Sequence, residues 1–198
     1  MPTAGVSVQG HLLLHKDAIH MASGNRPTVA SYAVADGKFS VMGGGRGKDL
    51  YVRNNQVRAT GFPLYWREED SHFLSPMEFE TPVGVIALTS TEKTSALARL
   101  AAAEPNQKPA AIWTNNAFQE IAAVAVTKNA LLVTGLNRAP KDPQKIDAGL
   151  SAIDPADGKL LWKQSLPATP VAWGLALDRA GRILVTLTDG RVLCFDRE

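Results

Sequence analysis

Residues 149–162 read Gly-Leu-Ser-Ala-Ile-Asp-Pro-Ala-Asp-Gly-Lys-Leu-Leu-Trp, which is the strongest local pattern in the chain. Two short apolar runs flank the polar segment Asp154–Gly158. Glycine adopts positive φ without steric cost, so Gly158 suits the tight turn that joins two antiparallel strands. The stretch therefore predicts a β-hairpin with its turn at Asp154–Gly158.

The same pattern of short apolar runs around polar turns recurs along the chain. Downstream it covers residues 173–195, and upstream it recurs at residues 12–21, 50–61 and 124–135. The Asp-Gly-Lys turn also recurs, at residues 36–38. Repeats of roughly 40–50 residues are typical of four-stranded propeller blades. We therefore expect an all-β fold of about three to four antiparallel blades. The expected units, within one domain of residues 1–198, are about 6–41, 48–90, 110–166 and 167–198.

Two segments interrupt the strand pattern. Residues 91–104 are rich in helix formers and stop before Pro105, which predicts a short helical insertion. Residues 62–82 are aromatic and acidic, which indicates an ordered excursion between blades rather than a linker. Exposed rings favour recognition, so Tyr65, Trp66 and Phe73 are a candidate binding surface.

The composition excludes several classes of protein. The chain has 198 residues, of which 45% are hydrophobic and 20% charged, and its net charge is +2. This balance is that of a globular protein, and so small a charge exerts little attraction on nucleic acid. No segment has the roughly 20 consecutive apolar residues that a membrane-spanning helix needs. The first residues lack the basic and apolar regions of a secretory signal.

Few residues offer metal-binding or nucleophilic chemistry. Cys194 is the only cysteine, so no intrachain disulfide can form, and its apolar neighbours predict a buried, inert thiol. His11, His15 and His20 are close in sequence. On one strand His11 and His15 would share a face and His20 would point away, which is at best a weak metal pair. The glycine-rich residues 41–49 lack the spacing of a phosphate-binding loop.

The segment from Ala152 to Trp162 matches the pattern Ala-x-Asp-x-x-x-Gly-Lys-x-x-Trp, and so resembles the pyrroloquinoline-quinone-like (PQQ-like) repeat of β-propellers. The resemblance is best from about residue 122 to the C-terminus. It implies that Trp162 docks on the next blade and that Trp173 is a second contact between blades. The residues that carry the motif and its docking role are Ala152, Asp154, Gly158, Lys159, Trp162 and Trp173. Residues 33–38 resemble a degenerate copy of the motif.

The resemblance also carries expectations about function. PQQ-like rings usually have six to eight blades, which implies that this chain is the C-terminal portion of a longer polypeptide and that its partners are the remaining blades or another protein. Quinoprotein dehydrogenases of this fold use a vicinal cysteine pair, which a single cysteine cannot provide. We therefore expect a non-catalytic protein- or ligand-binding scaffold without cofactor, in the periplasm, cell envelope or outside the cell. The alternative is part of a quinone- or calcium-dependent oxidoreductase or hydrolase, with carboxylates such as Glu68, Glu69 and Asp70 as candidate calcium ligands.

Overall fold

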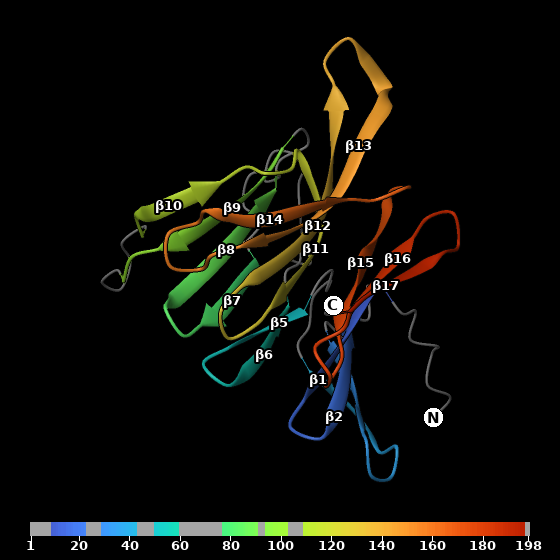
Figure 1. Ribbon diagram of the computed structural model, residues 1–198. Coiled ribbons are helices and arrows are strands. Elements are labelled where there is room, and N and C mark those ends of the chain that lie inside the picture. The colour runs from blue at the N-terminus through green and yellow to red at the C-terminus, as the bar shows by residue number, and fades with distance from the viewer. Residues whose placement is uncertain are drawn as a thin grey trace, which may run out of the picture. The chain divides into compact units, whose positions relative to one another are not determined.

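The computed structural model describes residues 9–22, 29–42, 50–59, 77–90, 94–102 and 109–196. These residues form β-strands joined by turns and irregular segments, and the mapped pairings between strands are antiparallel. The chain divides into two compact units, Met1–Phe79 and Glu80–Glu198. The prediction of an all-β fold of antiparallel blades is confirmed (Figure 1). Within the described residues, no helix has the length and apolarity needed to span a bilayer.

The first unit contains a four-stranded sheet, sheet A, and a two-stranded sheet, sheet B. Sheet A has the order β1 (Gln9–His15), β2 (Ala18–Ala22), β3 (Val29–Ala33) and β4 (Phe39–Met42), and sheet B consists of β5 (Leu50–Arg53) and β6 (Gln56–Ala59). Both turn residues have positive φ in the hairpins β1–β2 (Lys16 and Asp17) and β5–β6 (Asn54 and Asn55). This backbone matches the twist of paired strands, which is why such turns favour asparagine and aspartate.

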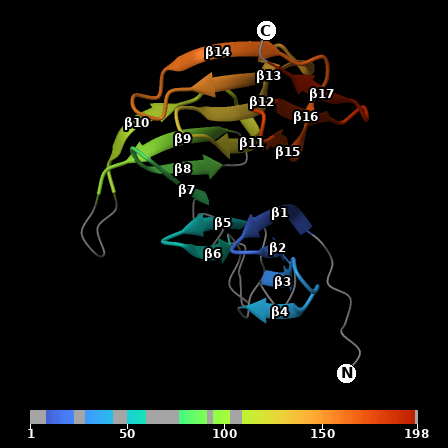
Figure 2. The same cartoon turned by 60° about the horizontal axis from the view of Figure 1, so that its bottom comes forward.

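The second unit contains three sheets, which are seen most clearly in Figure 2. Sheet C has the order β10-β9-β8-β7, from β10 (Ala111–Asn115), β9 (Ser95–Leu100) and β8 (Gly84–Ser90) to β7 (Met77–Thr81), which begins at the boundary between the units. Sheet D has the order β11 (Glu120–Val126), β12 (Leu131–Ala139), β13 (Asp142–Ile153) and β14 (Leu160–Ser165). Sheet E has the order β15 (Pro170–Leu177), β16 (Ile183–Leu187) and β17 (Val192–Phe195).

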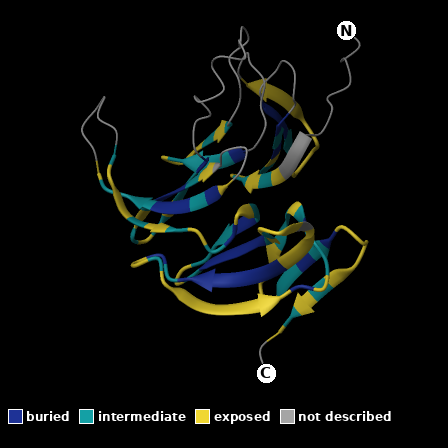
Figure 3. Cartoon of the chain, turned by 90° about the horizontal axis from the view of Figure 1, so that it is seen from above, coloured by how far each residue is buried: buried dark blue, intermediate teal, exposed yellow. Residues whose placement is uncertain are grey.

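Sheet D is covered on both faces, so its middle strands are apolar without alternation. One face packs on sheet E through a cluster formed by Leu136, Ala148, Leu150, Leu166, Val185 and Leu187. The other face holds the ring of Phe118, because Gly135 and Gly149 leave room for it. A Cβ at Gly135 would lie 2.6 Å from the Phe118 ring. In Figure 3 the buried strands of this unit appear dark blue beside an exposed outer strand in yellow.

The expected helical insertion at residues 91–104 is wrong where the structure describes it. Residues 95–100 form β9, which pairs with β8 on one side and β10 on the other. Helix propensity is a weak preference, and two neighbouring strands override it by satisfying the backbone and burying Leu97 and Ala98. The strands of sheet C lie on both sides of the unit boundary expected at residue 90, with β7 and β8 before it and β9 and β10 after it.

Candidate docking site between blades

The turn between β13 and β14 is held by its own backbone. The Asp154 N–H donates to the Lys159 carbonyl at 2.8 Å, and the Gly158 N–H donates to the Asp154 carbonyl at 2.9 Å. The Asp154 carboxylate accepts from the Ala156 N–H at 2.7 Å. Gly158 has φ +74°, a conformation that a side chain would strain. These bonds fix the direction in which the carbonyls of the turn point.

An ion pair lies on the exposed side of the same turn. Lys159 Nζ is 2.6 Å from Asp157 Oδ2, and the Lys159 N–H donates to Asp157 Oδ1 at 3.0 Å. Hydrogen bonding to Lys159 lowers the pKa of the Asp157 carboxyl, and the same bond raises the pKa of Lys159. Both side chains are exposed, so the pair orders the turn more than it stabilises the fold.

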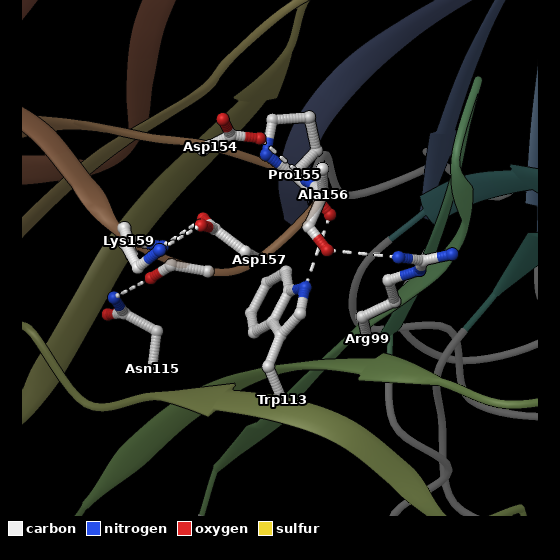
Figure 4. Close-up of polar contacts among 9 residues, drawn as sticks. Arg99, Trp113, Asn115, Asp154, Pro155, Ala156, Asp157 and Lys159 are labelled. Atoms are coloured by element: carbon white, nitrogen blue, oxygen red, sulfur yellow. Dashed lines mark hydrogen bonds and ion pairs between the residues drawn. The ribbon is translucent and has the colours of Figure 1, made fainter.

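The indole of Trp113, on the outer strand β10 of sheet C, lies directly against this turn (Figure 4). Its Nε1–H donates to the Pro155 carbonyl at 3.2 Å. A Cβ at position 158 would lie 2.6 Å from Trp113 Cδ2, closer than any real contact. Position 158 therefore requires glycine for two independent reasons, the positive φ and the ring above it.

Two further side chains of sheet C bind the same turn. Arg99 Nη1 donates to the Ala156 carbonyl at 2.9 Å, and Asn115 Nδ2 donates to the Gly158 carbonyl at 2.8 Å (Figure 4). Asn115 is held in place because its Oδ1 accepts from the Ala117 N–H at 2.9 Å. Three side chains of one blade thus bind three main-chain carbonyls of the next. We call this arrangement, formed by Arg99, Trp113, Asn115 and the turn 154–159, the docking joint.

The tryptophan in the docking joint is not the one that the sequence analysis expected. Trp162 lies on β14, the outer strand of sheet D, opposite Ala152, and is 42% exposed. Trp162 is thus more exposed than an indole buried between two blades would be, and its expected docking role stays a prediction. Sequence reasoning missed Trp113, although a signal existed: a receiving turn at residues 154–158 implies a tryptophan upstream, and Trp113 is the only one between Trp66 and Trp162.

The other expected residues fall in different environments. Trp173, on β15, is partly buried and has φ +59°, a rare conformation for a tryptophan. Cys194 is exposed, so the expectation of a buried thiol is wrong. It lies on the outer strand of sheet E, where Leu193 and Phe195 point into the core and the alternate positions point away.

The histidines near the N-terminus are not arranged as expected. The turn at Lys16–Asp17 puts His15 on β1 and His20 on β2, with ring centroids 6.4 Å apart, whereas His20 was expected to point away. His20 is buried and its Nδ1 is 2.7 Å from Ser31 Oγ, so it serves the packing of sheet A. In the described part of the chain, no three histidine, cysteine, aspartate or glutamate residues are grouped so that they could hold a metal ion.

Several expected residues cannot be placed. Tyr65, Trp66, Phe73 and the acidic residues Glu68, Glu69 and Asp70 lie outside the described residues, as does the side chain of His11. The candidate aromatic surface and the candidate calcium ligands therefore stay predictions.

Comparison with known families places the C-terminal repeat. Residues 147–198 match a PQQ-repeat family model described as outer membrane protein assembly factor BamB. No curated protein matches the chain. The matched segment begins in β13 and includes the turn that receives Trp113. Residues 147–198 are therefore similar to a PQQ repeat, and the four-stranded antiparallel sheets and the docking joint support a PQQ-like β-propeller arrangement.

Proposed function

We propose that the chain is a non-catalytic scaffold that binds a protein partner through the outer strand of sheet D. The observation that supports this is the exposure of three consecutive large apolar residues on β14. Leu160 is 52% exposed, Leu161 51% and Trp162 42%. Contiguous exposed apolar surface is uncommon on a protein that acts alone, and it marks sites of protein–protein contact.

The position of β14 favours a protein over a small molecule as the partner. The register of β14 shifts within this run, so Leu160 pairs with Ile153 and Trp162 pairs with Ala152. Because Ala152 and Ile153 are consecutive, Leu160 and Trp162 point to opposite faces of sheet D. A partner that covers the outer edge would bury apolar area on both faces at once. Tryptophan is enriched among the residues that dominate binding energy at interfaces, which makes Trp162 the expected anchor.

Location and cofactor use are part of the same proposal. The matched family is described as an outer membrane protein assembly factor, which supports a place for this chain in the bacterial cell envelope. The single cysteine supports action without the quinone chemistry of the dehydrogenases that share the repeat. The aromatic residues Tyr65, Trp66 and Phe73 are proposed as a second contact for the partner.

Site-specific photocrosslinking tests the role of β14. A photoreactive residue at position 161 identifies the partner, and the purified partner is then titrated with the unmodified chain and with Leu161→Ser. We expect Leu161→Ser to weaken binding at least about tenfold. Ile112→Ser is the matched control, because Ile112 is 54% exposed on β10, the outer strand of sheet C. Equal affinity for all three proteins would show that β14 is not the binding surface.

Calorimetric titration with Ca²⁺ and with pyrroloquinoline quinone tests the absence of a cofactor. We expect no saturable heat for either ligand at concentrations up to about 1 mM. Saturable binding of both ligands would favour the oxidoreductase alternative over the scaffold.

A further inference from the structure

The sequence Ala-Asp-Gly-Lys occurs twice in the chain, at residues 35–38 and 156–159. Each copy lies in the turn between the last two strands of a four-stranded sheet, β3–β4 in sheet A and β13–β14 in sheet D. Both glycines have positive φ, +69° at Gly37 and +74° at Gly158, and each glycine N–H donates to the carbonyl four residues earlier at 2.9 Å. Because sequence and turn conformation are the same, a difference in chemistry must come from the surroundings.

An Asp-Gly pair can rearrange without an enzyme. The glycine amide nitrogen attacks the side-chain carboxyl carbon, a C–N bond forms, and the carboxyl hydroxyl leaves as water with the amide proton. Water then opens the five-membered succinimide at the α-carbonyl, so that the chain continues through the side-chain carbonyl as isoaspartate. The second step returns the water that the first step releases, so no other reactant is consumed. Glycine favours the attack because it has no side chain to obstruct it.

Two conditions control the rate of this rearrangement in a folded protein. The turn must open locally so that the glycine nitrogen reaches the carboxyl carbon, and the free energy of local opening varies across a structure. The carboxyl group must also be protonated, because a carboxylate has no hydroxyl to lose. A cation beside the carboxylate lowers its pKa and so reduces the protonated fraction.

The turn of sheet D is restrained in both respects. The docking joint holds three of its carbonyls, and the ring of Trp113 lies against Gly158 (Figure 4). The hydrogen bond from the Lys159 side chain lowers the pKa of the Asp157 carboxyl. We therefore expect Asp157 to rearrange slowly.

The turn of sheet A is not restrained in this way by the described residues. Asp36 is exposed and forms no ion pair with them, and its Oδ1 accepts from the Lys38 N–H at 2.9 Å. Apart from its chain neighbours, a Cβ at Gly37 would have no described heavy atom within 4 Å. The Val34 N–H donates to the Asp17 carbonyl at 2.8 Å, which holds the start of the turn but not the Asp-Gly pair.

A third pair, Asp189-Gly190, meets one of the two conditions. A Cβ at Gly190 would also be open among the described residues. The Asp189 carboxylate is nevertheless bound, because Nε and Nη2 of Arg191 both donate to its Oδ2. The side-chain hydrogen bond from Arg191 lowers the pKa of the Asp189 carboxyl. This pair should therefore rearrange at a rate between those of the other two.

We propose that Asp36-Gly37 is the site at which this chain forms isoaspartate, and that the docking joint protects the identical pair Asp157-Gly158. The product has one more methylene in the main chain between β3 and β4, so the hydrogen bonds across the turn lose their geometry and β4 loosens. Its free α-carboxylate, on an exposed turn, suits an enzyme that methylates isoaspartate with S-adenosylmethionine. This chemistry is independent of the binding role proposed for β14.

The test compares the folded and the unfolded chain. The intact protein is incubated for weeks at neutral pH, in buffer and in guanidinium chloride. Trypsin places the three pairs on separate peptides, residues 17–38, 146–159 and 183–191, in which electron-transfer fragmentation distinguishes isoaspartate from aspartate. In buffer, isoaspartate should form at least about tenfold faster at residue 36 than at residue 157. In guanidinium chloride the two rates should be equal, because the Ala-Asp-Gly-Lys segments are identical.

A variant of the docking joint separates restraint from sequence. Trp113→Ala should raise the rate at residue 157 at least about threefold, because it frees the receiving turn, and it should not affect the turn of sheet A. Ile112→Ala is the matched control. Ile112 is 54% exposed on the same strand, so its replacement should change neither rate.

Three results would each overturn the proposal. The first is equal rates at residues 36 and 157 in buffer. The second is no isoaspartate at residue 36 in the folded protein after a time that produces it in the unfolded chain. The third is an unchanged rate at residue 157 in folded Trp113→Ala. The first two comparisons use the unmodified chain, so they decide the matter even where Trp113→Ala does not fold.

Discussion

The ring of Trp113 lies so close to Gly158 that a Cβ at position 158 would be 2.6 Å from Trp113 Cδ2. We therefore expect Gly158→Ala to destabilise the protein by about 2–4 kcal/mol, combining the strain of positive φ with overpacking. Urea unfolding measures the loss. Gly190→Ala is the control, and it should cost only about 1 kcal/mol because its Cβ position is open. Similar losses for the two variants would show that the indole does not constrain position 158.

The two tryptophans on outer strands should have opposite roles. Trp113→Ala removes the hydrogen bond to the Pro155 carbonyl and the cover over Gly158, so the free energy of unfolding should fall by about 3 kcal/mol. Trp162→Ala should cost less than about 1 kcal/mol, because the Trp162 side chain is 42% exposed. Thermal unfolding of both variants checks the contrast. A larger loss for Trp162→Ala would mean that Trp162 makes the stronger contact between blades.

Asp178 should make the free energy of unfolding depend on pH in the acidic range. Hydrogen bonds from the Arg182 backbone N–H (2.9 Å) and the Arg182 side chain (2.6 Å) lower the pKa of the Asp178 carboxyl. A carboxylate with a lowered pKa contributes stability above its unfolded pKa of about 3.9, and the contribution is lost as the pH falls through its folded pKa. The unmodified protein should thus lose more stability between about pH 5 and pH 2 than Asp178→Asn does. Parallel pH profiles from urea unfolding would contradict this.

Replacing Thr134 should increase the stability of the fold. Its side chain is fully buried in sheet D, and Oγ1 has no hydrogen-bond partner among the described residues. A buried hydroxyl without a partner costs about 1–3 kcal/mol. Thr134→Val keeps the shape and removes the hydroxyl, so it should raise the free energy of unfolding by about 1 kcal/mol. Thr127→Val is the control and should lower stability, because the Thr127 hydroxyl bonds the Ala130 carbonyl and N–H in a turn.

The sequence was sufficient to predict the strands that lie next to distinctive turns. The Asp-Gly turn at residue 158, the Lys-Asp turn at residue 16 and the Asn-Asn turn at residue 54 all join paired strands. Each contains glycine, asparagine or aspartate, the residue types that best tolerate positive φ. β9 was missed for the opposite reason. Its residues prefer a helix locally, and only the neighbours β8 and β10, which pair with it on either side, make it a strand.

The docking joint could be predicted in type but not in detail. The motif around Gly158 indicated a tryptophan contact between blades, yet Trp113 and Asn115 lie about 40 residues upstream of the carbonyls that they bind. Only packing reveals such a pairing. The exposure of Cys194 was hidden for a similar reason, since an apolar run does not show which of its positions point outward.

The joint between sheets C and D recognises main-chain carbonyls of the turn, those of Pro155, Ala156 and Gly158. Every residue type has a main-chain carbonyl, so most side chains of the receiving turn can be replaced without losing these hydrogen bonds. Selection then acts on very few positions, chiefly the glycine and the indole. Homologous blades of this kind can drift apart until ordinary sequence comparison no longer relates them, while they still stack in the same way.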